Sequence, residues 1–536
     1  MAARSSPRAE STGGCREGAA PAGVPKGAQP VPGNAKGLGE RANMANLFRK
    51  KAVAYDNSEF GLKRCLSALD LTLLGVGAII GTGIFVLTGH AAAVQSGPGV
   101  VLSFIVAGIA CGFAALSYAE LASSVGGCGS AYGYSYAAFG ELIAWIIAWD
   151  LILEYGVSVA AVANGWSGYF NNALTSMGIG LPDALTRGPS ALAWNEHLGG
   201  ALQWFGFDPN APDVKGAGAG GIINLPAASI ILLLMLLLII GVKESARINA
   251  AAVVIKLIAI AIFIGVAVFN VNPDNWSPFL PFGWFSHDGS RPIGVLAGAS
   301  IVFFAYVGFD AVSTAVEEAY QPQRDVPIGI LAALIFCTLI YVIVSALMTG
   351  IVPYSVLNVP SPASEALLRI GYNTAAGLVA TGVVAGLTTV MLVLYYALTR
   401  IIVGVSRDGL LPAFFEAVNP RTHTPVRTTV ITGTVMAIMA GFIPLGVLAE
   451  LVNIGTLAAF VLVCGGVIAL RITHPDMPRP FKTPGGIMLP FLGILSCGAL
   501  IAFLPYETHL RFIVWLAVGL VIYFGYSIRR SKLAMA

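Results

Sequence analysis

The chain has 536 residues, of which 56% are hydrophobic and only 11% are charged, and its formal net charge is +3. A soluble domain carries about 25% charged residues, so lipid rather than water must cover most of the folded surface. The sequence has no basic patch interleaved with aromatic residues, which excludes a nucleic-acid-binding surface. Together these properties predict an all-α polytopic membrane protein.

The N-terminal segment differs from the rest of the chain. Residues 1–43 are rich in Ala, Gly, Pro and Arg and contain no apolar run, which predicts a disordered tail that is not a signal peptide. Met44 opens the segment MANLFRKK, which resembles a natural start. We therefore expect the tail to be either a non-native upstream extension or a dispensable segment, and residues 44–67 to be cytoplasmic.

Apolar segments of membrane-spanning length follow one another along the chain. A membrane helix needs about 20 mostly apolar residues. Twelve segments are predicted to be spans, of which the third and eighth are long enough to be tilted or to extend beyond the bilayer. They are residues 68–92, 99–122, 141–171, 222–241, 248–269, 293–314, 327–351, 374–404, 428–443, 447–470, 487–504 and 511–528.

The placement of Lys and Arg predicts the orientation. With the N-terminus inside, the outer loops hold five of the thirty Lys and Arg residues, one lies well inside a span, and twenty-four are cytoplasmic or at cytoplasmic helix ends. Cytoplasmic loops carry an excess of these residues, so we expect both termini in the cytoplasm, with 529–536 as a cytoplasmic tail. The longest outer loop is 172–221, and the cytoplasmic segment 405–427 is predicted to be an amphipathic interfacial helix with a Pro-rich exit.

Span 1 contains the segment GVGAIIGTGIF at 75–85, with four glycines in nine residues. Such a density is costly for a continuous helix, and a break is expected at Gly81. Lipid cannot satisfy the backbone groups that a broken helix exposes, so they must face a cavity or a ligand. The N-terminus of the outer half-helix would favour an anion. Tight packing of helices through small residues is the alternative interpretation.

Span 6 contains a second segment of this kind, SIVFFAYVGFD at 300–310. It places Gly308 in mid-membrane beside the polar residues Tyr306 and Asp310. Spans 1 and 6 hold equivalent places if spans 1–5 and 6–10 are inverted repeats. A pair of interrupted helices at matching positions is the best sequence pointer to a transporter site, so the pairing favours binding over packing.

Several ionisable residues lie within the predicted spans, and four of them are singled out as candidates. Asp150 and Glu154 are one helical turn apart in span 3, Lys256 is in span 5, and Asp310 ends the interrupted part of span 6. Such residues are costly in lipid and are functional candidates, although a structural hydrogen bond explains Asp150 and Glu154 equally well. For Lys256 we favour function, because a buried lysine can release and regain a proton near neutral pH. The alternative is a fixed cation that pins span 5 to span 1.

The sequence shows no sign of catalysis. None of the six histidines pairs with a second ligand at metal-binding spacing. The glycines of span 1 lie in an apolar span without the preceding strand that a dinucleotide-binding segment needs. We therefore expect no metal, no cofactor and no enzymatic activity.

Four long segments resemble the amino acid–polyamine–organocation (APC) superfamily. Within it they are most similar to the cationic amino acid transporter (CAT) family and its bacterial relatives. The resemblance implies the leucine-transporter (LeuT) fold, with inverted five-helix repeats at 68–269 and 293–470 and two further spans within 487–528. The segments are FGLKRCLSALDLTLLGVGAIIGTGIFVLTG (60–89), GSAYGYSYAAFGELIAWIIAWDLILEYGVS (129–158), IVFFAYVGFDAVSTAVEEAYQPQRDVPIGI (301–330) and SRDGLLPAFF (406–415).

The resemblance also implies a binding site for one amino acid, at the midplane between spans 1 and 6. The substrate carboxylate would meet Thr82 and Gly83 on span 1. The ammonium would meet backbone carbonyls of both spans, near Ile79 and at Phe304, Ala305 and Val307. This placement agrees with the dipole argument, in which N–H groups face the anion and carbonyls face the cation.

We predict a secondary amino acid transporter of the plasma (inner) membrane that works by alternating access. In proton-coupled relatives a span 5 lysine takes the place of a sodium ion, so the proton is the expected coupling ion. Lys256 is the expected coupling residue, with Glu154 and Asp310 as lesser candidates.

Other functions are less favoured. A sodium-coupled or exchange-type transporter of amino acids or polyamines is the main alternative. A channel would be expected to show filter loops or a ring of like residues, and a membrane sensor would carry a soluble output domain. The sequence leaves the substrate open between cationic and medium-sized neutral amino acids.

Overall fold

The computed structural model describes a largely helical molecule. The described residues are 49, 66–125, 131–189, 221–241, 246–289, 291–314, 316, 319–420, 422 and 424–535. The predicted tail 1–43, nearly all of 44–67 and residues 190–220 of the predicted outer loop lie outside this part of the chain.

The first half of the chain begins with an interrupted helix. α2 (Ala68–Ile79) starts at a capping box, in which the Asp70 carboxylate accepts from the Ser67 N–H at 2.9 Å and Ser67 Oγ accepts from the Asp70 N–H at 3.3 Å. Ile80 is extended, and the helix then resumes as η2, a π-helical turn. The elements after α2 are η2 (Gly83–Leu87), α3 (Thr88–Ala91), η3 (Ala92–Ser96), η4 (Gly97–Gly99), α4 (Val100–Val125), α5 (Ala131–Ala138), α6 (Glu141–Ser176), α7 (Asp183–Thr186), α11 (Leu225–Ile240) and α12 (Ala246–Ala267).

The second half opens with a short antiparallel hairpin and a second interrupted helix. In the hairpin, Ser286 pairs with Ile293. The interrupted helix consists of α13, the 3₁₀ turn η6 and α14. The elements are η5 (Pro273–Trp276), β1 (Ser286–Asp288), β2 (Arg291–Ile293), α13 (Val295–Val302), η6 (Phe303–Tyr306), α14 (Ala311–Thr314), α15 (Pro322–Ile351), η8 (Tyr354–Val356), α16 (Pro362–Arg369), α17 (Asn373–Arg407), η9 (Ala413–Glu416), α18 (Val426–Phe442), α19 (Leu445–Thr473), α20 (Met488–Ala502), α21 (Tyr506–Ile522), η10 (Tyr523–Ser527), α22 (Ile528–Arg530) and α23 (Lys532–Met535).

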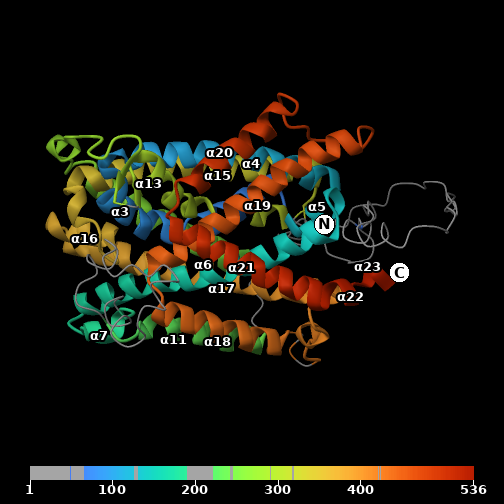
Figure 1. Ribbon diagram of the computed structural model, residues 1–536. Helices are drawn as coiled ribbons and strands as arrows, with labels where there is room; N and C mark the ends of the chain where they lie inside the picture. Colours follow the sequence, from blue (N-terminus) through green and yellow to red (C-terminus); the bar gives the residue numbers. More distant parts are fainter. Residues whose placement is uncertain are drawn as a thin grey trace, which may run out of the picture.

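The long helices run side by side between two ends of the molecule (Figure 1). α16, α7 and α3 lie at one end, on the left, and α5, α22 and α23 lie at the other. α6 is central, since it packs against α17, α19, α18 and α11. Both interrupted helices contact α4, which brings them together beside α6.

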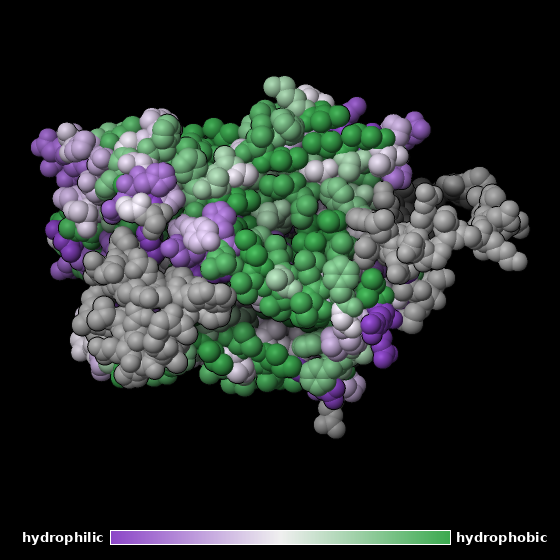
Figure 2. All heavy atoms as spheres, viewed as in Figure 1, coloured by the Kyte–Doolittle hydropathy of each residue, from purple (hydrophilic) through white to green (hydrophobic). Residues whose placement is uncertain are grey.

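The distribution of apolar residues fits a protein that crosses a membrane several times. Hydrophobic residues cover the middle of the visible face, and hydrophilic residues gather at the two ends (Figure 2). Within the described residues, six helical stretches are long and apolar enough to span a bilayer, and six shorter apolar helices accompany them. The long stretches are Gly83–Val125, Glu141–Thr175, Pro322–Ile351, Asn373–Arg407, Leu445–Thr473 and Tyr506–Arg530.

The segment 405–427 differs from its prediction as an amphipathic helix. α17 continues to Arg407, and the chain then turns at Gly409, whose φ is +83°. Among the described residues of this segment, the 3₁₀ turn η9 is the only helical element before α18 begins. A glycine in the left-handed region ends a helix, and Pro412 and Pro425 each lack the N–H that a helix interior needs.

The end of the molecule that carries α5 is closed by residues that are distant in sequence. The carboxylate of Glu141, at the start of α6, accepts hydrogen bonds from the hydroxyls of Tyr136 (3.1 Å), Tyr523 (3.2 Å) and Ser531 (2.5 Å). The Lys532 N–H donates to the Asp408 carbonyl at 3.1 Å. Residues 523–532 are therefore docked on the first turn of α6 and on the turn that follows α17.

A buried ion pair joins α4 to α19 and to the segment that follows it. Arg471 Nε donates to Glu120 Oε1 at 2.9 Å, and the Thr483 N–H donates to Glu120 Oε2 at 2.8 Å. Arg479 lies with its Nε 3.6 Å from Glu120 Oε1. Its Nη2 also donates to the carbonyls of Leu470 and His474 at the end of α19, which also accept from the N–H groups of His474 and Met477.

We expect Glu120→Ala to lower the thermal stability strongly. The change leaves Arg471 buried without its main counter-charge, which typically costs about 3–5 kcal/mol. Glu365→Ala is the matched control, because Glu365 pairs with Arg369 at 3.0 Å on the surface, where a pair contributes at most about 1 kcal/mol. The melting temperatures of the two purified variants in detergent test this difference, and equal values would contradict it.

Candidate functional site

The two interrupted helices contact each other at their breaks. A β-carbon on Gly83, just beyond the break in span 1, would lie 2.2 Å from Ala305 Cα in η6. Gly308, which follows η6 with a φ of +111°, would place a β-carbon 3.1 Å from the carbonyl oxygen of Ala78. Glycine is therefore required at both points of contact, and the predicted pair of breaks forms one structural unit.

The carbonyl groups at the end of α2 are paired in different ways. The Val76 carbonyl accepts from the Ile80 N–H at 3.0 Å. The Gly77 carbonyl accepts from Lys256 Nζ at 2.7 Å. The Ile79 carbonyl lies 2.9 Å from the Tyr341 hydroxyl, which is also 2.7 Å from the Ala305 carbonyl. Side chains of two other helices thus pair carbonyls that the last turn of a helix leaves free.

The amide groups on the other side of the break remain available. The Phe85 N–H donates to the Gly81 carbonyl at 3.4 Å and begins the outer half of the helix. The N–H groups of residues 81–84 find no backbone acceptor within the part of the chain that the structure describes. The Thr82 side chain is fully buried (0% exposed), and its hydroxyl has no partner among those residues. Several donors therefore converge where the sequence predicts a carboxylate.

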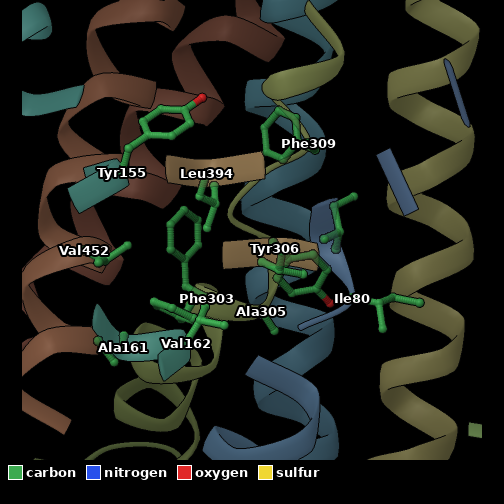
Figure 3. Close-up of a cluster of buried hydrophobic side chains, with 14 of the residues drawn as sticks. Ile80, Tyr155, Ala161, Val162, Phe303, Ala305, Tyr306, Phe309, Leu394 and Val452 are labelled. Atoms are coloured by element: carbon green, nitrogen blue, oxygen red, sulfur yellow. The ribbon is translucent and has the colours of Figure 1, made fainter. Parts of the chain in front are cut away.

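Apolar side chains surround the breaks. Figure 3 shows Phe303 between Val162 and Leu394, with Ile80 beyond Ala305 and Tyr306. The labelled residues come from both interrupted helices and from α6, α17 and α19, and they are buried. They are Ile80, Tyr155, Ala161, Val162, Phe303, Ala305, Tyr306, Phe309, Leu394 and Val452.

The remaining predicted binding residues lie in or next to η6. Phe304 is buried, and its carbonyl accepts from the Val307 N–H at 3.2 Å. Val307 is half-buried and extended at the point where η6 ends. The break in span 6 therefore places Phe304, Ala305 and Val307 within one turn, facing the break in span 1 through Ala305.

Lys256 of α12 reaches the break in span 1 through the space beside a glycine of α17. Its side chain is 2% exposed. A β-carbon on Gly386 of α17 would lie 2.5 Å from Lys256 Cγ and 3.0 Å from Cε. The absent side chain at Gly386 thus leaves the space that the lysine stem occupies on its way to the Gly77 carbonyl.

The acidic residues form a second group, between α6, α19 and the segment after η6. The Tyr155 hydroxyl lies 3.5 Å from Asp310 Oδ2, and Glu154 directly precedes Tyr155 on α6, one helical turn after Asp150. Asp150 contacts α19, since a β-carbon on Gly455 would lie 2.6 Å from its Oδ1. Glu154 and Asp310 therefore share one region, whereas Lys256 lies on α12 against α2 and α17. No cluster of His, Cys, Asp and Glu that could hold a metal occurs within the described ranges.

Comparison with known proteins places the chain in a family. Residues 66–525 match the family model described as amino acid permease. The chain belongs to the amino acid permease family. It is 48% identical over 493 residues to the branched-chain amino acid permease BcaP of Bacillus subtilis, which covers 91% of this chain and 99% of that protein. It is 46% identical to the methylthioribose transporter of Bacillus subtilis, with 91% and 100% covered.

A more distant relative supports the resemblance to the CAT family. The permease is 35% identical to the vacuolar cationic amino acid transporter 4 of Arabidopsis thaliana, over 81% of this chain and 68% of that protein. The expected membership of the APC superfamily is therefore confirmed. The permease is a multi-pass membrane protein.

Sequence reasoning missed several residues that shape the site. Tyr341 of α15 contacts the break in span 1, and Gly386 of α17 leaves room for the Lys256 side chain. Gly165 of α6 would place a β-carbon 2.8 Å from Thr82 Cγ2. Asn453 of α19 donates to the carbonyls of Ser300 and Ile301 at 2.8 and 3.0 Å, near the end of α13. A single tyrosine, asparagine or glycine within an apolar span gives too weak a signal. The glycines of span 1 could be noticed in the sequence because four of them lie close together.

The structure also changes the expected reason for glycine at position 83. The space beside Gly83 is occupied by the backbone of Ala305, so we expect Gly83→Ala to push the two breaks apart. Overpacking of this kind typically costs about 1–3 kcal/mol. Gly81→Ala is the matched control, because the nearest atom to its β-carbon would be 3.8 Å away. A melting temperature for Gly83→Ala as high as that of Gly81→Ala would contradict the contact.

Proposed function

We propose that this permease is a secondary active transporter that moves an α-amino acid by alternating access, with the substrate held between the breaks of spans 1 and 6. The observation that supports this most is the opposite polarity of the backbone groups that meet there. Unpaired N–H groups and the Thr82 hydroxyl lie on one side, and the carbonyls of Ile79 and Ala305 lie on the other. An α-amino acid carries a carboxylate and an ammonium that complement these groups.

The membrane arrangement proposed with this function has twelve spans. The six long and six shorter apolar helices correspond to them if η2, α3 and η3 complete the first span and η6 and α14 complete the sixth. We propose that the first ten spans form LeuT-type inverted repeats, with α16 outside and α5 in the cytoplasm of a bacterial cell. The distribution of Lys and Arg supports this orientation.

The substrate that we favour is a neutral amino acid with a branched aliphatic side chain. The side chains around the breaks are apolar, among them Phe303, Val162 and Leu394. Apolar surroundings accommodate an aliphatic side chain, whereas the charged end group of lysine or arginine would need a nearby hydrogen-bonding or oppositely charged partner. The relative with 48% identity is a branched-chain amino acid permease, which supports the same class.

Methylthioribose is the second candidate substrate, because a relative with 46% identity is named for its transport. It has neither a carboxylate nor an ammonium, so it would not use the charged ends of the two breaks. The two substrates therefore make opposite predictions about which parts of the solute are required.

We expect L-leucine to be bound only when both of its charged groups are present. Isoamylamine lacks the carboxylate and 4-methyl-2-oxopentanoate lacks the ammonium, so each should compete poorly for leucine uptake into proteoliposomes. Each would leave one set of backbone groups unpaired, at about 1–3 kcal/mol per group. Strong competition by isoamylamine, or uptake of methylthioribose without leucine uptake, would contradict the proposed substrate.

The proton is the proposed coupling ion, and Lys256 is the proposed coupling residue. Its ammonium donates to the Gly77 carbonyl two residues before the end of α2. Loss of its proton would remove the positive charge that strengthens this hydrogen bond, although the neutral amine can still donate. The hold of α12 on α2 would weaken, which links the charge of the lysine to the break. Glu154 and Asp310 are lesser candidates, because Glu154 is on α6 and Asp310 is in the segment after η6, and neither takes part in the contact between Lys256 and Gly77.

We expect Lys256→Met to bind L-leucine but to lose accumulation driven by a proton gradient, because methionine fills the same space without a titratable group. Lys256→Arg distinguishes a role in proton coupling from a purely structural role in which a fixed cation holds α12 to α2. Arginine keeps the cation but does not release its proton. If Lys256 only pins α12 to α2, Lys256→Arg should retain proton-driven uptake. Uptake into proteoliposomes with imposed proton or sodium gradients is the measurement. Sodium-driven accumulation by the wild type, or full proton-driven accumulation by Lys256→Met, would refute the assignment.

A further inference from the structure

Tyr341 lies where the breaks of spans 1 and 6 meet. It is on α15, it is fully buried (0% exposed), and its ring packs against those of Phe104 and Tyr306 with centroids 5.3 Å away in each case. Its hydroxyl oxygen is 2.9 Å from the Ile79 carbonyl and 2.7 Å from the Ala305 carbonyl. The Tyr341 hydroxyl therefore contacts both breaks at once.

The Tyr341 hydroxyl has too few hydrogens to pair with both carbonyls. A tyrosine hydroxyl has one hydrogen to donate, so it can pair with only one of the two carbonyls at a time. The other carbonyl faces an oxygen at hydrogen-bond distance without a hydrogen between them. A buried carbonyl in that position lacks part of its pairing, and a group with several N–H donors would complete it.

We propose that Tyr341 is a positioning residue for the ammonium group of the substrate. This inference rests on the proposed function. The hydroxyl holds the carbonyls of Ile79 and Ala305 at a fixed separation and shares its single hydrogen between them. The substrate ammonium then supplies the donor that the shared hydrogen leaves missing. Tyr341 thereby sets where the ammonium lies and favours a primary ammonium over a substituted one.

Tyr306 provides a comparison within the same aromatic cluster. Its ring is equally buried, and its hydroxyl donates to a single carbonyl, that of Phe104, at 2.8 Å. That bond lies between span 6 and α4 and involves neither carbonyl of the proposed ammonium site. Removing the Tyr306 hydroxyl therefore disturbs the packing of the cluster in the same way without changing the bridge between the breaks.

The experiment compares Tyr341→Phe with Tyr306→Phe and wild type. Each variant is reconstituted, and the concentrations of L-leucine and of N-methyl-L-leucine that halve the uptake of labelled leucine are measured. Tyr341→Phe should weaken leucine binding about tenfold, because the two carbonyls that receive the ammonium are no longer held at a fixed separation. The preference for leucine over N-methyl-leucine should fall as well, because carbonyls that are no longer held together discriminate less against the methyl group. Tyr306→Phe should keep the wild-type preference.

A structural role for the Tyr341 hydroxyl would give a different pattern. It would weaken leucine and N-methyl-leucine by the same factor and leave their ratio unchanged in both variants, and that outcome would overturn the inference. Wild-type leucine affinity in Tyr341→Phe would also overturn it. Failure of leucine and every other amino acid to compete in the wild type would overturn the proposed function itself, and is distinguished by appearing before any variant is tested.

Discussion

A helix that ends inside a membrane leaves backbone groups that lipid cannot pair, and the centre of this permease is organised around that requirement. The last turn of α2 meets it with donors from elsewhere, Lys256 on α12 for the Gly77 carbonyl and Tyr341 on α15 for the Ile79 carbonyl. Each donor fixes a neighbouring helix to the break. The amides of residues 81–84 find no backbone acceptor within the described residues, so one interruption both joins the helices and leaves polar groups within an apolar core.

Close approach of the backbone is the second condition for this arrangement. Gly83 lets η2 rest on the backbone of Ala305, and Gly308 lets the chain after η6 pass the carbonyl of Ala78. Gly386 has a different function, since it makes room for a charged side chain instead of another backbone. The glycines of this protein therefore do not form one class, and their effect depends on what occupies the space where a side chain would be.

The helices could be predicted from sequence because membrane-spanning length and apolar composition are local properties. The breaks could be predicted because glycine density and the paired segments at 75–85 and 300–310 are also local. Tyr341 could not be predicted, because its importance depends on two carbonyls contributed by residues far away in the chain. The interfacial helix over 405–427 was predicted from an amphipathic pattern, and the turn at Gly409 and the prolines outweighed that pattern.

The docking of residues 523–532 has a consequence for how the protein is made. Glu141 begins a central helix, yet two of the three hydroxyls that pair with its buried carboxylate come from Tyr523 and Ser531, almost four hundred residues later. During translation this carboxylate stays without those donors until nearly the whole chain has left the ribosome. A product that stops early lacks these two donors, so a prematurely terminated polypeptide differs from the finished one at the first turn of a central helix.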